Sequence, residues 1–350
     1  MEILNKKDYH LYEEFLIKQK GSSFLQCNNW AKVKDQWKNE IVVSKNQKGE
    51  IIGGAMILIR KIPPFNVSLM YSPHGPCWDF KNKEILNDIL KGVKELSKKY
   101  NGYLFKMDPF VSEGDEEFIK NAKELGFSYD LSKQKGFQTY QPRVNYIIKF
   151  NGRSKDEIFA NFHKKCRYNI RVAIKHGVEC KVCGPDKIDD FYNILKVTAK
   201  RDGFIIRAKE YYVKMLESLG DYIKLYICYY EGKPISGAIT TFFGERAVYV
   251  YGASDNNHRN VMPNYLMQWT MISDAIDMGC EIYDFMGIAG YDDENSKTYG
   301  IYRFKSSFTG EIAKYAGEFD LVLNKKKKAL ADISFFGLKC IKKAKNFLNR

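Results

Sequence analysis

The chain has 350 residues, of which 45% are hydrophobic and 28% charged, enough apolar material for a large core and enough length for two domains. It contains no run of about 18 apolar residues and no apolar signal core after Met1, so we expect neither a transmembrane helix nor secretion and predict a cytoplasmic location. The net charge of +14 favours a negatively charged partner, such as nucleic acid, a nucleotide sugar or an anionic membrane; solubility alone is the alternative.

The first half of the chain predicts a run of antiparallel strands followed by a helix. Strands flank a turn at residues 47–50, and a third strand leads to residues 71–73. Apolar residues then recur at helical spacing over residues 83–100, which predicts an amphipathic helix. A further strand ends at Asp108.

The middle of the chain is predicted to be helical. Ser154 and Glu157 form a capping-box signature, which predicts one helix that continues to Gly177. Two more helices are expected near residues 188–200 and 209–219. We find no long heptad insertion and no low-complexity linker.

The second half repeats the order of the first. Its predicted elements are strands at 223–230 and 235–243, a strand reaching 251–254, a helix at 264–278 and a strand ending at 283–285. Gly49 matches Gly232 and Gly54 matches Gly237, both pairs 183 residues apart, which indicates a duplication. Each half resembles the acetyltransferase unit of the GNAT superfold. The predicted fold class is therefore α/β, with two tandem GNAT-like domains whose mixed, mostly antiparallel sheets are flanked by helices.

Four basic residues share one face of the first middle helix, because they recur at spacings of three and four: Lys164, Arg167, Arg171 and Lys175. Such a face suits phosphate, since arginine offers forked donors to phosphate oxygens. A solvated helix face explains the same spacing, and the sequence leaves both readings open. The opposite face is expected to pack against the core, and its residues are Phe162, Cys166, Ile170, Ala173 and Ile174.

Two further positions are candidates for acid–base or charge-stabilising chemistry. Asp108 ends a predicted strand, where a carboxylate is well placed for a cleft; a turn-forming aspartate before Pro109 is the alternative. Lys305 follows Phe304 after a glycine-bearing loop at 290–300, and a lysine between aromatic residues can stabilise a developing oxyanion. An ordinary strand lysine is equally compatible with the spacing.

No metal or cofactor is predicted. Cys180 and Cys183 form a lone pair without a histidine at zinc-finger spacing, and the five histidines show no metal-binding pattern. Neither a P-loop nor a dinucleotide-binding fingerprint is present. Residues 259–264 stand where acetyl-CoA enzymes carry a glycine-rich loop, but Pro263 removes an amide donor there and no glycine is present.

Short motifs along residues 20–323 resemble, in order, those of the FemABX peptidyltransferases. These motifs are Phe24-Leu25-Gln26 with Trp30-Ala31 and Lys34, Tyr71-Ser72-Pro73 with Gly75-Pro76, Asn169-Ile170-Arg171, Arg201 with Phe204, Arg207 with Tyr211-Tyr212, Tyr251-Gly252 with Ser254, Tyr283-Asp284-Phe285 with Gly287, and Phe304-Lys305. Each motif is short, but together they run through both halves of the chain in one order, which makes the resemblance specific.

The resemblance implies two GNAT-like domains, an acceptor-binding one made of residues 1–146 with about 315–350 and a second made of 147–314. It implies an aminoacyltransferase that moves an amino acid from aminoacyl-tRNA to the stem-peptide amine of a peptidoglycan precursor, either UDP-MurNAc-pentapeptide or lipid II. The product would be part of the interpeptide bridge. Because the sequence shows no coiled-coil arm, the chain resembles the compact type of this family.

The resemblance also implies a set of site residues. Lys34 and Arg207 would hold acceptor phosphates, and the other substrate-binding residues would be Ser72, Tyr103, Asp108, Tyr211 and Tyr251. Phe304 and Lys305 would lie at the reaction centre, where Lys305 stabilises the oxyanion and Asp108 accepts a proton from the attacking amine. The basic face formed by Lys164, Arg167, Arg171 and Lys175 would guide the tRNA.

The C-terminal stretch, residues 325–350, begins with four lysines and continues with an approximate helical stripe of apolar residues. A basic amphipathic helix of this kind can lie on an anionic membrane, pack on the first domain or touch tRNA. Two other functions stay open for the whole chain: an acetyl-CoA-dependent N-acyltransferase of the GNAT type, and a non-catalytic protein that binds nucleic acid or the cell envelope.

Overall fold

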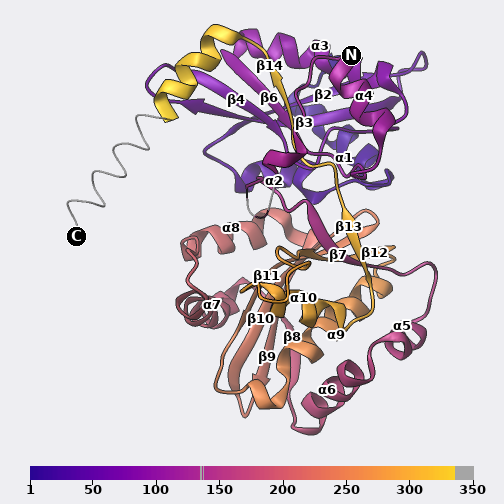
Figure 1. Cartoon of the computed structure of the whole chain (residues 1–350), viewed down its shortest axis with the longest axis vertical. Helices are drawn as coiled ribbons and strands as arrows, with labels where there is room; N and C mark the ends of the chain where they lie inside the picture. Colours follow the sequence, from indigo (N-terminus) through magenta and orange to yellow (C-terminus); the bar gives the residue numbers. More distant parts are fainter. Residues whose placement is uncertain (135, 137, 336–350) are drawn as a thin grey trace. The chain divides into compact units, whose positions relative to one another are not determined.

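The computed structural model in Figure 1 describes residues 1–134, 136 and 138–335, and these fall into two units. Unit 1 comprises residues 1–141 together with the described chain from Tyr315 onward, and unit 2 comprises Pro142–Lys314. The boundary expected at residue 146 falls inside a strand of unit 2, β7 (Val144–Lys149). The described 3₁₀ turns are Lys6–Asp8, Phe24–Gln26, Leu131–Lys133, Pro185–Lys187, Gly220–Tyr222 and Arg259–Val261.

The sheet of unit 1 is mixed and runs in the order β1-β2-β3-β4-β6-β14, with β5 paired to β3. Its strands are β1 (Glu2–Ile3), β2 (Lys38–Lys45), β3 (Ile51–Ile62), β4 (Val67–Ser72), β5 (Cys77–Trp78), β6 (Gly102–Met107) and β14 (Phe319–Val322). The described neighbours are antiparallel except β4 and β6, which run parallel, with Ser72 opposite Met107. Ser72 and Met107, the C-terminal residues of these two strands, therefore lie at the same end of the sheet.

The helices of unit 1 cover its sheet. The amphipathic helix expected at 83–100 is α3 (Lys83–Lys99), which starts where the Asn82 side chain accepts a hydrogen bond from the Glu84 amide at 3.1 Å. Its apolar stripe, including Ile89 and Val93, is buried in one cluster with Phe105 of β6. The other described helices are α1 (Tyr9–Ile17), α2 (Asn28–Val33), α4 (Glu116–Glu124) and residues 325–335.

The sheet of unit 2 runs in the order β13-β7-β12-β11-β10-β9-β8. Besides β7, its strands are β8 (Glu179–Cys183), β9 (Ile223–Tyr230), β10 (Lys233–Phe243), β11 (Arg246–Ser254), β12 (Ile282–Gly287) and β13 (Glu311–Lys314). The described parallel pair is β11 with β12. The first and last strands of the unit, β7 and β13, pair antiparallel, with Val144 opposite Lys314.

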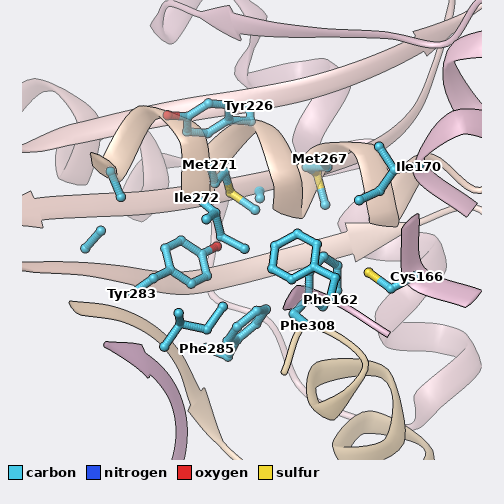
Figure 2. Close-up of a cluster of buried hydrophobic side chains, with 14 of the residues drawn as sticks. Phe162, Cys166, Ile170, Tyr226, Met267, Met271, Ile272, Tyr283, Phe285 and Phe308 are labelled. Atoms are coloured by element: carbon cyan, nitrogen blue, oxygen red, sulfur yellow. The ribbon is translucent and has the colours of Figure 1, made fainter. Parts of the chain in front are cut away.

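The core of unit 2 lies between its sheet and two helices, as Figure 2 shows. Cys166 and Ile170 come from α6 (Lys164–Lys175), and Met267, Met271 and Ile272 come from α9 (Pro263–Asp277). These side chains pack with Tyr283 and Phe285 of β12 and with Phe308. The remaining helices are α5 (Lys155–Asn161), α7 (Ile188–Asp202), α8 (Lys209–Leu219) and α10 (Tyr299–Ser306).

The two units repeat one topology, as the glycine spacing predicts. In each unit, three antiparallel strands lead through a helix to a fourth strand that is parallel to the third: β2-β3-β4, α3 and β6 in unit 1, and β9-β10-β11, α9 and β12 in unit 2. One matched pair lies under aromatic rings: a Cβ at Gly54 would be 2.6 Å from the Tyr12 ring, and a Cβ at Gly237 would be 2.9 Å from the Phe191 ring.

The single helix expected from Ser154 to Gly177 is instead two helices, α5 and α6. The capping box is present at Ser154 and Glu157, but α5 ends at Asn161 because Phe162 adopts an extended conformation, with ψ 152°. Phe162 is thereby buried in the core of the unit. Arg167 stabilises the break, since its guanidinium donates to the carbonyl oxygens of Ala160 and, at 2.5 Å, Phe162.

Candidate functional site

The strongest candidate in unit 1 is the carboxylate of Asp108, which follows the end of β6. It is buried, and it accepts hydrogen bonds of 2.6 Å from the Tyr71 hydroxyl and 2.6 Å from the His74 backbone amide. Burial raises the pKa of Asp108 well above its usual value, and the two hydrogen bonds oppose that rise. An aspartate whose role is limited to a turn before proline would be expected to stay solvated. Its burial distinguishes Asp108 from such a turn residue.

Gln26 holds the loop that follows β4. Its amide nitrogen donates to the Pro73 carbonyl oxygen at 2.8 Å and to Ser72 Oγ at 3.1 Å, and its amide oxygen accepts from the Tyr12 hydroxyl at 3.0 Å. A Cβ at Gly75 would come within 2.4 Å of the Gln26 side chain, so the loop closes tightly on this residue. Gln26 belongs to the first FemABX-like motif, but nothing in the sequence assigns it this positioning role. Ser72, expected to bind substrate, is fully buried in this network.

The other two candidates of unit 1 are Tyr103 and Lys34. Tyr103 is the second residue of β6 and Asp108 follows its last residue, so the two are five residue steps apart, roughly 16 Å along the strand. Tyr103 is buried in a cluster with Ile62 and Ala331, and burial raises its pKa to about 12. Lys34 follows α2, and its Nζ lies 4.6 Å from the centre of the Trp30 ring.

In unit 2, Lys305 binds the C-terminal end of β12. Its Nζ donates to three backbone carbonyl oxygens, those of Phe285 at 2.6 Å, Met286 at 3.3 Å and Gly287 at 2.8 Å. Burial lowers the pKa of Lys305 to about 8, and the charge of Asp284 partly opposes that shift. Lys305 lies in α10, so the alternative of an ordinary strand lysine is wrong.

A buried ion pair between Arg246 and Asp284 lies at the same end of β12. Asp284 accepts from Arg246 Nη1 at 3.0 Å and from Asn145 Nδ2 at 3.1 and 3.2 Å. Its second oxygen also accepts from the Met286 amide at 2.7 Å, and Met286 has a left-handed φ of 63°. The sequence did not lead us to predict this network. An aspartate between Tyr283 and Phe285 in an apolar strand nevertheless indicates a buried carboxylate that needs a partner.

The structure brings together three of the predicted substrate-binding residues, Arg207, Tyr211 and Tyr251. The Arg207 guanidinium lies 4.7 Å from the centre of the Tyr211 ring, and the hydroxyls of Tyr211 and Tyr251 are hydrogen-bonded. Burial raises the pKa of both tyrosines, while the nearby Arg207 lowers it. Tyr212 packs edge-on against the Tyr251 ring at 5.2 Å and buttresses the group. Arg207 precedes α8, and Tyr211 and Tyr212 lie near its start, which accounts for the spacing of this motif.

The basic face of α6 is only partly available to a ligand. Lys164 and Lys175 are exposed, and Arg171 lies 5.6 Å from the Phe159 ring. Arg167 instead holds the α5–α6 junction, as described above. On the opposite side, Cys166, Ile170 and Ala173 are buried as expected. Ile174 is 59% exposed, so the expectation that it packs is wrong.

Phe304 precedes Lys305 on α10 but faces the other way. Its ring contacts Tyr265 of α9 edge-on, with centroids 5.1 Å apart, and both rings line two cavities of about 390 and 380 Å³. Two neighbouring residues of one helix thus present an aromatic side chain to open space and an amine to the interior.

Along the chain that the structure describes, no helix has the length and apolar character needed to cross a bilayer.

Comparison with known proteins places this architecture in a family. The model of the FemAB family matches residues 8–233 and 229–333. The chain belongs to the FemAB family. The lipid II:glycine glycyltransferase of Staphylococcus epidermidis is 28% identical over 393 residues, covering 93% of this chain and 92% of that protein. The Staphylococcus aureus protein of the same name is 27% identical over 398 residues, covering 93% of each chain.

Solved structures agree with this assignment. The crystal structure of FemX is 25% identical, with a TM-score of 0.87 over 94% of this chain and 99% of that chain. A tandem GNAT protein from the clavulanic acid biosynthesis pathway shares the fold alone, at 8% identity and a TM-score of 0.55 over 92% of this chain and 98% of that chain. The predicted family and the α/β class with tandem GNAT-like units are therefore confirmed, and the chain is an aminoacyltransferase.

Proposed function

We propose that this enzyme transfers an amino acid from aminoacyl-tRNA to the stem-peptide amine of a peptidoglycan precursor, lipid II or UDP-MurNAc-pentapeptide, and works in the cytoplasm, where charged tRNA is found. The observation that carries the proposal is the FemAB match along both units, together with relatives that are named for glycyl transfer to lipid II. The reaction forms an amide bond between the acceptor amine and the aminoacyl carbon, and it breaks the ester bond to the tRNA ribose.

Asp108 is the proposed proton acceptor. The attacking amine must lose a proton, and a buried carboxylate with a raised pKa is a stronger base than a solvated one. The hydrogen bonds from Tyr71 and His74 fix both carboxylate oxygens in place. Asp108 therefore combines a defined position with a basicity suited to this step.

Lys305 is the proposed donor to the oxyanion of the tetrahedral intermediate. All three of its donors are used by carbonyl oxygens at the end of β12, so it has to give up one of these bonds, of which the 3.3 Å bond to Met286 is the longest. Removing one oxyanion donor typically costs about 2.7–4 kcal/mol in the barrier. Phe304, next to it, is proposed to line the reaction centre.

The remaining site residues are proposed to hold the substrates. Arg207 with Tyr211 and Tyr251 forms a cationic and aromatic group suited to an acceptor phosphate, and Lys34 would bind a second phosphate. Ser72 and Tyr103 stay predictions, and their burial favours supporting roles. For tRNA, we retain Lys164, Arg171 and Lys175 as contacts, with Arg167 shaping the helix that carries them.

A direct assay tests the function. Purified protein is incubated with pools of charged tRNA and either UDP-MurNAc-pentapeptide or lipid II, and the acceptor is weighed by mass spectrometry. The expected product is heavier by one aminoacyl residue and forms only when charged tRNA is present. Mass added from acetyl-CoA instead, or RNA binding without any product, would favour one of the two alternative functions.

We also propose that the helix at residues 325–335 contacts an anionic membrane surface. Ala331 and Ser334 are buried on unit 1, whereas Ile333 is 60% exposed, next to the run of lysines at 325–328. Apolar side chains beside lysines suit an interface of negatively charged lipid. Residues 336–350 of the predicted tail lie outside the described residues.

Vesicle flotation tests the membrane contact. Ile333→Ser should weaken binding to vesicles with anionic lipid, and neutral vesicles should bind little of either protein. Val182→Ser, at a 54% exposed apolar residue of β8, is the matched control. Equal flotation of the two variants would refute this contact.

A further inference from the structure

Two free cysteines face each other across the edge of the unit 2 sheet. Cys180 lies in β8, the end strand of the described sheet, and Cys228 lies opposite it in β9 as its direct partner in the antiparallel register. Partners of this kind point to the same face of the sheet, with their Cα atoms about 4.5 or 5.5 Å apart. Both separations fall within the range of about 4.4–6.8 Å that a disulfide bond spans. The backbone therefore needs no rearrangement to accept a bond between the two sulfurs.

The two thiols interact in the reduced protein. The Cys228 S–H group can donate to the Cys180 sulfur and to the Pro263 carbonyl oxygen, which lies 3.7 Å from Cys228 Sγ. A thiolate at Cys180 is the stronger acceptor, since a hydrogen bond to a charged atom is favoured. This bond lowers the pKa of Cys180 against the effect of burial, and it raises the pKa of Cys228 together with burial. Cys180 is therefore the sulfur that ionises first, and the thiolate is the reactive form of cysteine.

The two cysteines differ in access to solvent. Cys180 is partly exposed at the sheet edge, whereas Cys228 is fully buried in the core of the unit. A small reagent from solution can reach Cys180, and the buried thiol of Cys228 lies beside it. This arrangement gives Cys180 the attacking role and Cys228 the resolving role in an oxidation.

Cys183, which shares the Cys180-x-x-Cys183 spacing, is not placed to be the partner. It lies three residues further along β8, so its side chain points to the opposite face of the sheet. Three residue steps of an extended strand put its Cα roughly 10 Å from that of Cys180, beyond the limit of about 7 Å for a disulfide. Its thiol is instead hydrogen-bonded with the Tyr229 hydroxyl.

We infer that Cys180 and Cys228 form a reversible disulfide bond when the enzyme meets hydrogen peroxide. The Cys180 thiolate attacks one peroxide oxygen; an S–O bond forms, the O–O bond breaks, and the released hydroxide takes up the proton that Cys180 had lost. The Cys228 sulfur then attacks the resulting sulfenic acid; the S–S bond forms, and the hydroxyl leaves as water with the Cys228 proton. Two thiols are oxidised and one peroxide is reduced to two waters. A dithiol reductant reverses the change.

The disulfide would close residues 180–228 into a covalent loop. That loop carries α7 and α8, and with them Arg207 and Tyr211 of the proposed phosphate-binding group. The bond would also prevent the edge strand β8 from opening away from β9. Oxidation removes the Cys228 S–H group, so the Pro263 carbonyl oxygen at the start of α9 loses a donor. The oxidised and reduced proteins thus differ around α7, α8 and α9, whatever reaction unit 2 takes part in.

Peptide mapping of the full chain tests the inference. The reduced protein is treated with hydrogen peroxide, the excess is destroyed with catalase, and the remaining thiols are blocked with N-ethylmaleimide in urea. Digestion without reductant should yield a Cys180 peptide joined to a Cys228 peptide, two hydrogen atoms lighter than their sum. Dithiothreitol added before the blocking step should abolish it. Cys166 and Cys280, two other buried thiols of unit 2, should be recovered as the blocked form.

Three variants separate the roles of the sulfurs. Cys228→Ser should lose the joined peptide and leave a sulfenic acid on Cys180, which dimedone traps. Cys180→Ser should lose both products. The matched control is Cys183→Ser, a partly exposed cysteine of the same strand, which should form the joined peptide like the wild type.

Hydrogen exchange gives a second readout that does not depend on a variant. The amides of β8 should exchange more slowly in the oxidised wild type than in the reduced one, because β8 is then tied to β9. Cys180→Ser treated with the same peroxide should show no such difference.

Three outcomes would overturn the inference. In the first, Cys180 stays fully blocked by N-ethylmaleimide after peroxide. In the second, Cys180 is joined to Cys183 or to a second chain. In the third, Cys166 and Cys280 are oxidised as readily as Cys180 and Cys228, which would mean that the pair has no special reactivity.

Discussion

The hydroxyl of Tyr71 donates a hydrogen bond of 2.6 Å to Oδ2 of Asp108. This bond stabilises the ionised carboxylate and so opposes the rise in its pKa that burial causes. In Tyr71→Phe the pKa of Asp108 should rise further. A hydrogen bond to a charged group contributes about 1.5–3 kcal/mol, which corresponds to about 1 to 2 pH units.

If Asp108 is the base, the acidic limb of the kcat/KM profile should therefore move to higher pH in Tyr71→Phe, and activity below pH 7 should fall most. Aminoacyl transfer measured between pH 5 and 9 checks this. The control is Tyr229→Phe, which removes a similar 2.8 Å hydrogen bond to Asp190 on unit 2. An unshifted limb in a folded Tyr71→Phe protein would exclude Asp108 as the titrating base.

Lys305 should make the stability of unit 2 depend on pH. Burial lowers its pKa to about 8 in the native state, against about 10.4 in an unfolded chain. Between these values the unfolded state binds the extra proton, so the free energy of unfolding rises with pH. From pH 7.5 to 9.5 the titration of Lys305 should raise the free energy of unfolding by ~2 kcal/mol.

In Lys305→Met that contribution is absent. Urea unfolding at pH 7.5, 8.5 and 9.5 should therefore show a gap between wild type and variant that widens with pH, while the variant is less stable throughout because three carbonyl oxygens lose their donor. Both proteins contain the same tyrosines and cysteines, so the pH dependence that these groups add cancels in the difference between them. A gap that stays constant would mean that Lys305 titrates like a solvated lysine.

Loss of the Arg246 side chain should strongly destabilise the folded protein. Both Arg246 and Asp284 are buried, and Arg246→Met would leave Asp284 without its cationic partner. Breaking a buried pair in this way costs about 3–5 kcal/mol. Thermal unfolding followed by circular dichroism should show a large drop in midpoint, whereas Lys209→Met, which breaks an exposed pair with Asp189, should change it little. Similar midpoints for the two variants would contradict this.

Gly54 should be intolerant of a side chain. A Cβ there would lie 2.6 Å from the Tyr12 ring and 3.0 Å from the Val42 carbonyl oxygen, so Gly54→Ala must displace a buried ring. Overpacking of this kind typically costs 1–3 kcal/mol. Gly114→Ala, with open space at the Cβ position, should be neutral or stabilising by about 0.4–1 kcal/mol. Chemical denaturation of both variants measures the difference, and equal midpoints would show that Tyr12 yields easily.

Those glycines also show how far sequence patterns reach. The spacing of Gly54 and Gly237 predicts the duplication, because in both units an aromatic ring from a helix packs on the strand at that point. Helical periodicity likewise predicts α3, α7, α8 and α9 within two residues at each end. Local signals succeed where the physical cause is local or repeated.

The missed features depend on contacts between distant residues. The break after Asn161 follows from burial of Phe162 and from the reach of the Arg167 guanidinium, neither of which a capping box reveals. Lys305 could be ranked as a candidate, but its partners are carbonyl oxygens 18 to 20 residues earlier. Gln26 similarly acts on a loop 47 residues away. Motifs thus indicate which residues matter before tertiary contacts show what they do.

The pairing of β7 with β13 has a consequence for synthesis on the ribosome. The chain enters and leaves unit 2 on neighbouring strands, and β14, the edge strand of unit 1 beside β6, is made only after residue 314. During synthesis, β6 of unit 1 therefore has no partner strand on its β14 side until the whole of unit 2 has been translated. An exposed edge of that kind invites pairing with other chains, so translation that stalls within unit 2 should yield aggregating fragments.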